Sequence, residues 1–190
     1  MKFTRAEIPE IVICEPEIWG DSRGYFMESF RQDKLEQFLG FPVYFCQDNQ
    51  SKSAFGVLRG LHYQAFPMAQ SKLIRVLQGR IWDVAVDIRI GSPTFGGHVA
   101  LELSEENQRQ LFIPKGFAHG FVTLSHEAVI AYKVDNYYSH EHDRGIAFQD
   151  GLLSIDWKIN KKYFVLSDKD KNQPVLDKAE LFEYQMKLYA

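Results

Sequence analysis

Hydrophobic and polar residues alternate in short runs along the middle of the chain. In the clearest run, residues 81–90, Val84, Val86 and Ile88 fall on one side of an extended chain, and Asp83 and Asp87 fall on the other. Turn-forming residues separate this run from similar ones at 57–63, 72–77, 98–103, 116–122 and 128–134. Many short strands at this spacing predict an antiparallel β-sandwich or barrel.

Helical periodicity is confined to two short segments. Residues 31–39 place Leu35, Phe38 and Leu39 on one face, and Gly40 follows as a C-terminal stop. A weaker helical run follows Ala179. The sequence therefore predicts a mainly β protein with a few short helices.

Length and composition limit the organisation of the chain. Its 190 residues, 45% of them hydrophobic, suffice for one domain with a substantial core and are too few for two. No apolar stretch is long enough to span a bilayer, and the first ten residues carry charges where a secretory signal is apolar. Cys14 and Cys46 lie beside apolar residues and are expected to be buried thiols. We expect one cytoplasmic domain, residues 1–190, with no membrane association.

The charge balance narrows the choice of partner. A net charge of −3 argues against the broad positive surface that nucleic-acid binding needs. It leaves room for a small local cluster of cations. Any anionic partner is therefore expected to be a small molecule.

Three polar residues occupy strands that are otherwise apolar. His62 follows Leu61, His119 shares a strand face with Phe117 and Phe121, and Tyr132 follows a run of Ala, Val and Ile. Each one alone fits a hydrogen-bonded core residue. Because a small β-barrel normally fills its interior with apolar side chains, the three together favour a functional pocket.

Two segments resemble the sequence blocks of the cupin fold. The second block, Pro-x-Gly-x-x-His, is present as residues 114–119. The first is altered, because Gln64 stands where the pattern has a histidine and Lys72 stands where it has a metal-ligating glutamate. Loss of an imidazole and a carboxylate, with gain of an ammonium, disfavours a divalent cation. We predict a pocket without a metal, suited to an organic anion.

A longer series of segments resembles one family within the cupins, the dTDP-4-dehydrorhamnose 3,5-epimerases. These segments are GDSRGYFMESF, GVLRGLHYQ, QSKLIRVLQG, DVAVDIR, GSPTFG, LSEENQRQLFIPKGFAHGF, AYK, DRGI and LSDKD. The resemblance implies a cupin jelly roll that converts dTDP-4-dehydro-6-deoxy-D-glucose to dTDP-4-dehydro-L-rhamnose without a cofactor. It also implies a homodimer in which N-terminal strands are exchanged.

The resemblance assigns catalytic roles to four residues. His62 would be the base that removes protons beside the ketone, paired with Asp170 of the Ser-x-Lys-Asp segment. The neighbouring Asp168 is a less favoured partner, and a solvated charge run is the alternative interpretation of this segment. Tyr132 would donate a proton from the other side of the sugar. Lys72 would ease that release or contact the ketone oxygen, although a lysine that reaches solvent is an alternative.

Further residues are expected to bind the substrate. Arg59 would hold the pyrophosphate by bidentate hydrogen bonds, and His119 would contact the sugar or a phosphate. Tyr138, where the family often has tryptophan, would pack on the sugar or base. The family positions that hold the nucleotide, some of them supplied by the neighbouring subunit, are Arg23, Phe26, Glu28, Gln47 and Asn49.

Other activities stay open at this stage. Some relatives in the family epimerise only one carbon, and related cupins move a ketone between carbons. Both activities need an acid and a base in the same pocket, so the sequence separates them poorly. From other classes, the chain fits a metal-dependent cupin oxygenase or a carbohydrate-binding barrel without catalysis. Bound iron would distinguish the first, and sugar-nucleotide binding without isotope exchange would distinguish the second.

Overall fold

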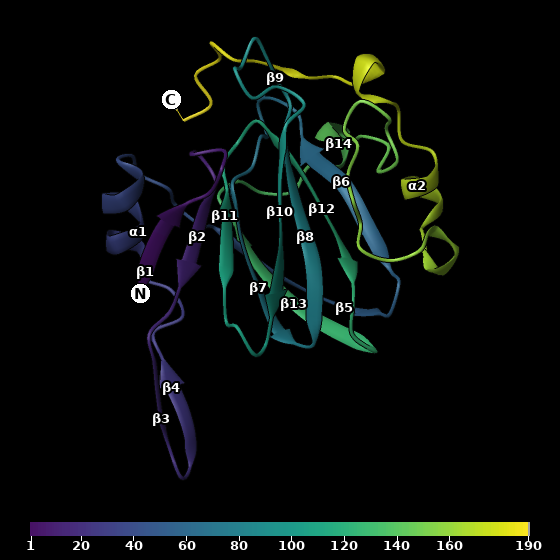
Figure 1. Cartoon of the computed structure of the whole chain (residues 1–190). Helices are drawn as coiled ribbons and strands as arrows, with labels where there is room; N and C mark the ends of the chain where they lie inside the picture. The colour runs from purple at the N-terminus through teal and green to yellow at the C-terminus, as the bar shows by residue number, and fades with distance from the viewer. Residues whose placement is uncertain (190) are drawn as a thin grey trace.

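Two antiparallel β-sheets face each other in the computed structural model, which describes residues 1–189 (Figure 1). Ala190, the last residue of the predicted domain, lies outside the described residues. The first sheet has the order β1 (Lys2–Arg5), β2 (Val12–Glu15), β11 (Gln110–Ile113), β7 (Lys72–Gln78), β13 (Glu127–Val134) and β5 (Gln47–Ala54). The second has the order β10 (His98–Ser104), β8 (Arg80–Asp87), β12 (Phe117–Thr123), β6 (Leu58–Gln64) and β14 (Asp143–Gly145).

Smaller elements surround the two sheets. A hairpin of β3 (Ile18–Asp21) and β4 (Gly24–Met27) projects away from the body of the molecule (Figure 1). Helix α1 (Gln32–Leu39) follows it, and the four-residue helix α2 (Asp168–Lys171) lies beyond the second sheet. Strand β15 (Phe182–Glu183) pairs in parallel with β9 (Arg89–Ile90). Single 3-10 turns cover His140–His142, Lys161–Tyr163 and Leu176–Lys178.

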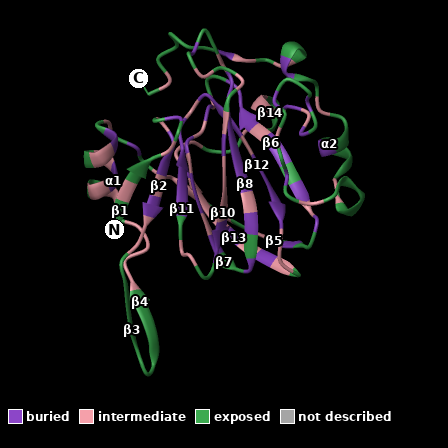
Figure 2. Cartoon of the chain, viewed as in Figure 1, coloured by how far each residue is buried: buried purple, intermediate pink, exposed green. Residues whose placement is uncertain are grey.

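The apolar core lies in three layers. Alternate residues of the facing strands, such as Ile74, Val76 and Ile81, fill the space between the sheets. The outer side of the second sheet is covered by segment 146–182, and part of the outer side of the first is covered by α1. Figure 2 shows the buried residues concentrated on the central strands, whereas the β3–β4 hairpin is exposed.

The strand predictions and the first helix are confirmed. All six predicted strands form, and α1 ends at Gly40, which adopts a φ of 84° that glycine tolerates best. The run 81–90 divides after Asp87, because the Asp87 carboxylate accepts hydrogen bonds from the backbone of Arg89 and the hydroxyl of Ser92, which turn the chain. The mainly β, antiparallel cupin architecture is as predicted.

The weaker helical prediction after Ala179 is wrong. As far as Tyr189, the last described residue, this segment forms the short strand β15 and turns but no helix. Its apolar side chains are held by distant partners, since Phe182 packs on the ring of Tyr63 with 5.9 Å between centroids. Such long-range packing overrides a weak local helical preference.

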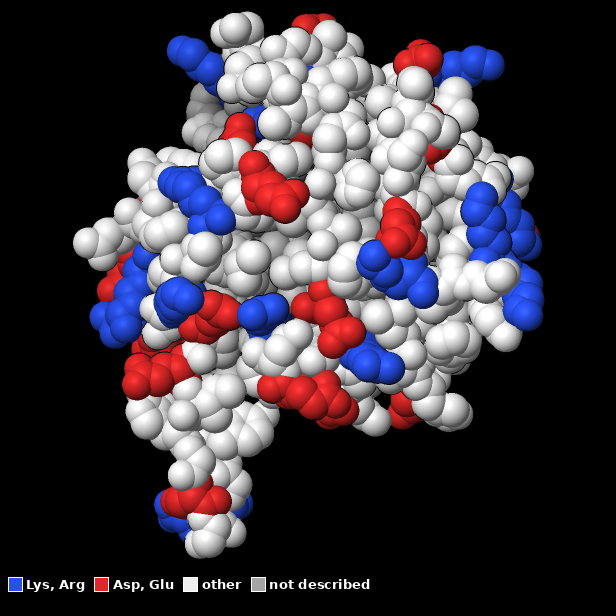
Figure 3. Space-filling model, viewed as in Figure 1, with Lys and Arg blue, Asp and Glu red and all other residues white. Residues whose placement is uncertain are grey.

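The remaining expectations concern thiols, membranes and charge. Cys14 is a buried free thiol, as predicted, whereas the free thiol of Cys46 is only partly buried. Within residues 1–189, no helix is long and apolar enough to cross a bilayer. On the face shown in Figure 3, acidic and basic side chains are interspersed.

Candidate active site

Two neighbouring cavities, which share lining residues, lie among the strands that carry the predicted catalytic residues. The outer cavity has a volume of about 330 Å³ and the inner about 200 Å³. Both are lined by His62, Lys72 and Tyr132. The outer one is also lined by Gln47, Asn49 and Tyr138, and the inner one by Arg59 and His119. The fold thus gathers eight of the predicted site residues around one pocket.

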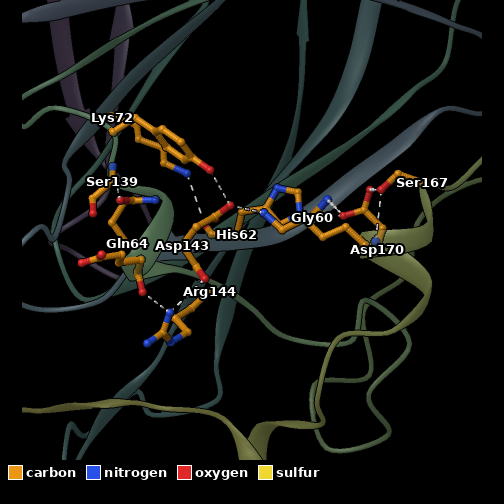
Figure 4. Close-up of polar contacts among 12 residues, drawn as sticks. Gly60, His62, Gln64, Lys72, Ser139, Asp143, Arg144, Ser167 and Asp170 are labelled. Carbon is orange, nitrogen blue, oxygen red and sulfur yellow. Dashed lines mark hydrogen bonds and ion pairs between the residues drawn. The ribbon is translucent and has the colours of Figure 1, made fainter.

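The imidazole of His62 is held by a buried carboxylate. His62 Nε2 lies 2.6 Å from Asp170 Oδ1, and Figure 4 shows Asp170 and Ser167 on one side of the ring. Asp170 also accepts hydrogen bonds from the Ser167 hydroxyl at 2.6 Å and the Gly60 backbone N–H at 3.3 Å. Burial alone would raise the pKa of Asp170, but the bonds from His62 and Ser167 outweigh it and lower the pKa. Asp170 is therefore an anion at neutral pH.

The LSDKD segment explains how this carboxylate reaches His62. Ser167 caps α2, its hydroxyl oxygen accepting a hydrogen bond from the Asp170 backbone N–H at 3.1 Å. The cap turns Asp170 inward, where it is 5% exposed, while the side chain of Asp168 points to solvent and pairs with Lys171. This geometry favours Asp170 over Asp168 and does not fit a fully solvated charge run.

Lys72 begins β7 and reaches across to β6. Its Nζ donates a hydrogen bond to the His62 carbonyl oxygen at 3.2 Å (Figure 4). Burial lowers the pKa of Lys72 to about 8, and the negative charges of Asp83 and Asp143 oppose that fall. Lys72 is thus largely an ammonium at pH 7. Its head lies at the two cavities, where the residue is partly buried.

Tyr132 lies on β13, opposite Asn49 of β5 and Ile74 of β7. Burial raises the pKa of its phenol, and the positive charge of Arg59 acts in the opposite direction. The sequence predicted that electrostatic role for Lys72, which lines both cavities with Tyr132, and Arg59 is a further cation whose charge acts on the phenol. The phenol is protonated at neutral pH, as a proton donor must be.

His119 lies directly across from His62 in the pairing of β12 with β6. Its Nε2 lies 2.8 Å from Oδ2 of Asp83, a residue of β8 that the sequence analysis did not single out for the site. Burial lowers the pKa of His119 despite the nearby Asp83 charge. Arg59 is exposed, and its Nε donates to the Ser53 hydroxyl oxygen at 3.1 Å, so its terminal nitrogens stay available for an anion.

Polar residues of several elements form the mouth of the pocket. The Tyr138 hydroxyl donates to Asp143 Oδ2 at 3.0 Å, and Gln47 Nε2 donates to Asn49 Oδ1 at 2.8 Å. Asp143 also forms an ion pair with Lys169. Asp143 and Lys169 were not predicted from the sequence, although they lie in the DRGI and LSDKD segments that carry the family resemblance. Their location in these two segments is the sequence signal that could have identified them.

Three predicted nucleotide-binding residues lie away from the pocket within one chain. Arg23, near the tip of the β3–β4 hairpin, pairs with Asp21. Phe26 is 70% exposed and stacks on Trp19, with ring centroids 6.0 Å apart. Glu28 pairs with Arg31 and Lys34 at the start of α1. Because the hairpin projects outward, the fold of a single chain does not bring these residues to His62.

The positions that hold metal ligands in other cupins carry different chemistry here. Gln64 is buried, and its Oε1 accepts a hydrogen bond from the Ser139 backbone N–H at 2.9 Å (Figure 4). Lys72 places an ammonium on the other ligand position. Among residues 1–189, no group of three or more His, Cys, Asp or Glu side chains is arranged to hold a metal ion. The metal-free pocket stays a prediction, and it rests on these two residues.

The fold and the pocket define a cupin-type acid–base enzyme, with a His–Asp pair, a protonated phenol and a partly buried ammonium around one pocket. The chain belongs to the dTDP-4-dehydrorhamnose 3,5-epimerase family, whose model matches residues 5–178. This confirms the predicted family and its isomerase class.

Individual relatives match over almost the whole chain. The dTDP-4-dehydrorhamnose 3,5-epimerase of Shigella flexneri is 52% identical over 182 residues, which cover 96% of this chain and 99% of that protein. A Legionella pneumophila dTDP-6-deoxy-D-glucose-3,5-epimerase, solved with dTDP-4-keto-L-rhamnose, is 48% identical with a TM-score of 0.93, over 97% of this chain and 99% of that one. A 3'-monoepimerase from Streptomyces bikiniensis, solved with dTDP-quinovose, is 32% identical with a TM-score of 0.85, over 91% and 87%.

Proposed function

We propose that this protein converts dTDP-4-dehydro-6-deoxy-D-glucose to dTDP-4-dehydro-L-rhamnose by inverting carbons 3 and 5, in the supply of dTDP-L-rhamnose. The observation that carries the proposal is the His62–Asp170 contact of 2.6 Å beside a cavity that Tyr132 and Lys72 also line. A base, an acid and a cation around one cavity are what proton exchange beside a ketone requires.

The His–Asp contact sets the direction of proton flow. A carboxylate only accepts hydrogen bonds, so the proton between the two residues is on His62 Nε2, and Nδ1 is free to take a proton from carbon 3 or 5. The electron pair of the broken C–H bond moves onto the ketone oxygen, where the Lys72 ammonium stabilises it. Tyr132 then gives its proton to the opposite face of the same carbon, which inverts that centre.

The remaining pocket residues bind the rest of the substrate. Arg59 is placed to hold the diphosphate, and Gln47, Asn49, Tyr138, Asp143 and Lys169 are placed to contact the nucleotide or sugar at the mouth. No step of this reaction requires a metal or cofactor, because acid–base chemistry and a fixed ammonium suffice. A dTDP-sugar is thus the expected partner, and no nucleic-acid or membrane partner is proposed.

A second subunit is proposed to complete the pocket. The projecting hairpin exposes Trp19 and Phe26, and its tip carries Arg23, a cation suited to a nucleotide diphosphate. On the outer side of the first sheet, a groove of about 410 Å³ is lined partly by Phe30, Leu73 and Leu77. A homodimer in which hairpins are exchanged would cover such apolar surface and bring Arg23, Phe26 and Glu28 to the partner's pocket.

Mixed subunits test this arrangement. Homodimers of Arg23→Ala and of His62→Ala should each be nearly inactive. Unfolding and refolding them together should restore activity, because one site of each mixed dimer then has both native residues. Failure to recover any activity, or a monomeric mass in solution, would contradict the shared site.

Isotope exchange tests the reaction itself. Incubation with dTDP-4-dehydro-6-deoxy-D-glucose in heavy water should place deuterium at carbons 3 and 5. Label at carbon 3 alone would instead support monoepimerisation, which the similarity to a 3'-monoepimerase makes the second candidate. His62→Ala should abolish exchange at both carbons while nucleotide binding persists, and unchanged turnover would refute His62 as the base.

The packing of the chain and the state of its cysteines support a single catalytic domain in the cytoplasm. Segment 146–182 packs on the outer side of the second sheet, which supports one catalytic domain over the chain. Both cysteines are free thiols, which suits the reducing cytoplasm. Limited proteolysis that releases no stable fragment, and recovery of the protein in the cytosolic fraction, are the expected results.

A further inference from the structure

A carboxylate with a single hydrogen-bond partner lies buried beneath the pocket. Asp83 is 0% exposed on β8, where it pairs with Phe121 of β12. Its Oδ2 lies 2.8 Å from His119 Nε2. Its Oδ1 has no hydrogen-bond partner among the described residues. Because a buried carboxylate usually accepts several hydrogen bonds, a compensating positive charge is expected nearby.

Lys72 supplies a positive charge on the same side of the sheets as this carboxylate. Asp83 alternates with Ile81 and Ala85 on β8, and Lys72 alternates with Ile74 and Val76 on β7. All four apolar residues lie in the core between the two sheets, so both charged side chains face that interior. Asp83 is the acid whose charge acts most strongly on the Lys72 ammonium, ahead of Asp143. Asp143 is in turn engaged by Lys169 and Tyr138 at the mouth. Asp83 is thus the acid that best stabilises the charge on Lys72.

We propose that Asp83 is a positioning residue that acts on two neighbours, Lys72 and His119, and gives each a different role in the pocket. Its charge keeps Lys72 an ammonium that donates to the ketone oxygen, and its Oδ2 fixes His119 as the neutral Nε2–H tautomer. His119 then accepts a hydrogen bond from a sugar hydroxyl through Nδ1. This proposal rests on the epimerase function proposed above.

The contacts of His119 support its assignment as the neutral Nε2–H tautomer. A carboxylate only accepts, so His119 Nε2 must carry the proton it shares with Asp83. Burial lowers the pKa of His119, and Lys72 and His62 lower it further by repulsion. The ring is therefore neutral at pH 7, with Nδ1 as an acceptor. A second cation beside Lys72 would be costly in so small a pocket.

Several other charged or titratable groups face Lys72 and enter its titration. They are His62 and Arg59 on β6, Asp83 on β8, His119 on β12, Tyr132 on β13, Asp143 on β14 and Lys169 on α2. Of these, Asp83 and Asp143 are the acids. Removal of Asp83 therefore leaves a single, mouth-lying acid to hold the Lys72 proton.

The substitution Asp83→Asn tests the proposal through a pH profile. In the native enzyme, kcat/KM should fall as pH rises through the Lys72 pKa of about 8. In D83N this alkaline limb should move down by roughly 1–2 pH units, the shift typical of losing one close opposite charge. Lys72→Arg should remove the limb, since a guanidinium stays charged, and D83N should add no new limb in that background.

A matched control separates this effect from general damage. Asp87→Asn removes another buried carboxylate of the same strand, one engaged by Arg89 and Ser92 away from the pocket. D87N should lower stability and leave the alkaline limb where it is. A limb that stays in place in D83N, or moves equally in D87N, would overturn the proposal.

Two measurements on the native protein apply even where D83N fails to fold. NMR of protein labelled with ¹⁵N-histidine should show His119 at pH 7 with Nε2 protonated and Nδ1 bare. Titration of the labelled Lys72 side chain should give a midpoint near 8. An Nδ1–H tautomer, an imidazolium at pH 7, or a Lys72 midpoint below about 6.5 would refute it. Absence of any isotope exchange in the native enzyme would instead refute the epimerase function.

Discussion

The sharpest prediction concerns the Asp170 carboxylate. Asp170→Asn keeps the size of the side chain and removes its charge. Once His62 takes a proton, the native imidazolium is stabilised by a carboxylate 2.6 Å away. With the two charge centres about 4 Å apart, such an ion pair contributes about 4 kcal/mol at an effective dielectric constant of about 20. The asparagine also gains an NH₂ group that donates hydrogen bonds, which disfavours the tautomer with Nδ1 free.

Loss of about 3 to 4 kcal/mol in the transition state corresponds to a fall in kcat of roughly 10²- to 10³-fold. KM should change little, because Arg59 and the mouth residues are untouched. The assay is initial-rate turnover of the 4-keto sugar nucleotide, with folding checked by thermal melting. Asp168→Asn is the control, since that exposed residue pairs only with Lys171, and its kcat should stay native. A kcat for D170N within tenfold of native would refute the reasoning.

Further predictions address proton donation and stability. Tyr132→Phe should lower product formation at least 10²-fold. Heavy water should still label the recovered substrate with unchanged configuration, because His62 removes and returns protons on one face. Product formation at the native rate would count against Tyr132 as the proton donor. Asp87→Asn should lower the free energy of unfolding by about 3 kcal/mol at pH 7, since Asp87 is 0% exposed and holds Arg89. Hydrogen bonds from Arg89, Ser92 and Thr94 outweigh burial and lower the pKa of Asp87. The contribution of Asp87 to stability is therefore present above the unfolded pKa of about 3.9. The difference in free energy of unfolding between native protein and variant, measured by chemical denaturation, should shrink as pH falls below that value. A difference that stays constant with pH would contradict this prediction.

The strands that the sequence predicted share one property. Each has one face in an apolar layer, as in β8, where Val84 and Val86 pack under the segment that follows β14. Strand β5, in contrast, carries Gln47, Asn49, Ser51 and Ser53 on its less exposed side. It faces the polar pocket, so it lacks the apolar alternation that identifies a strand. The substrate site itself concealed this element from sequence reasoning.

Some site residues could likewise be predicted from the sequence, and others could not. His62, His119 and Tyr132 were identified because polar residues in apolar strands require an explanation, and the family segments added Asp170 and Lys72. Asp83 was not assigned to the site, because within residues 81–90 it was one of several polar residues on one strand face. Its contact with His119 depends on the pairing of β8 with β12.

The sequence by itself determined the β architecture, the family and the chemical types of the catalytic side chains. Periodicity fixes which residues an extended chain can bury, and side-chain chemistry limits which reactions a set can perform. Only the tertiary structure showed that Asp170 lies 2.6 Å from His62 while Asp168 points to solvent, and that Arg59 and Tyr132 line one cavity. These relations join residues more than 70 positions apart, and only the packing of the two sheets, with α2 against β6, sets such distances.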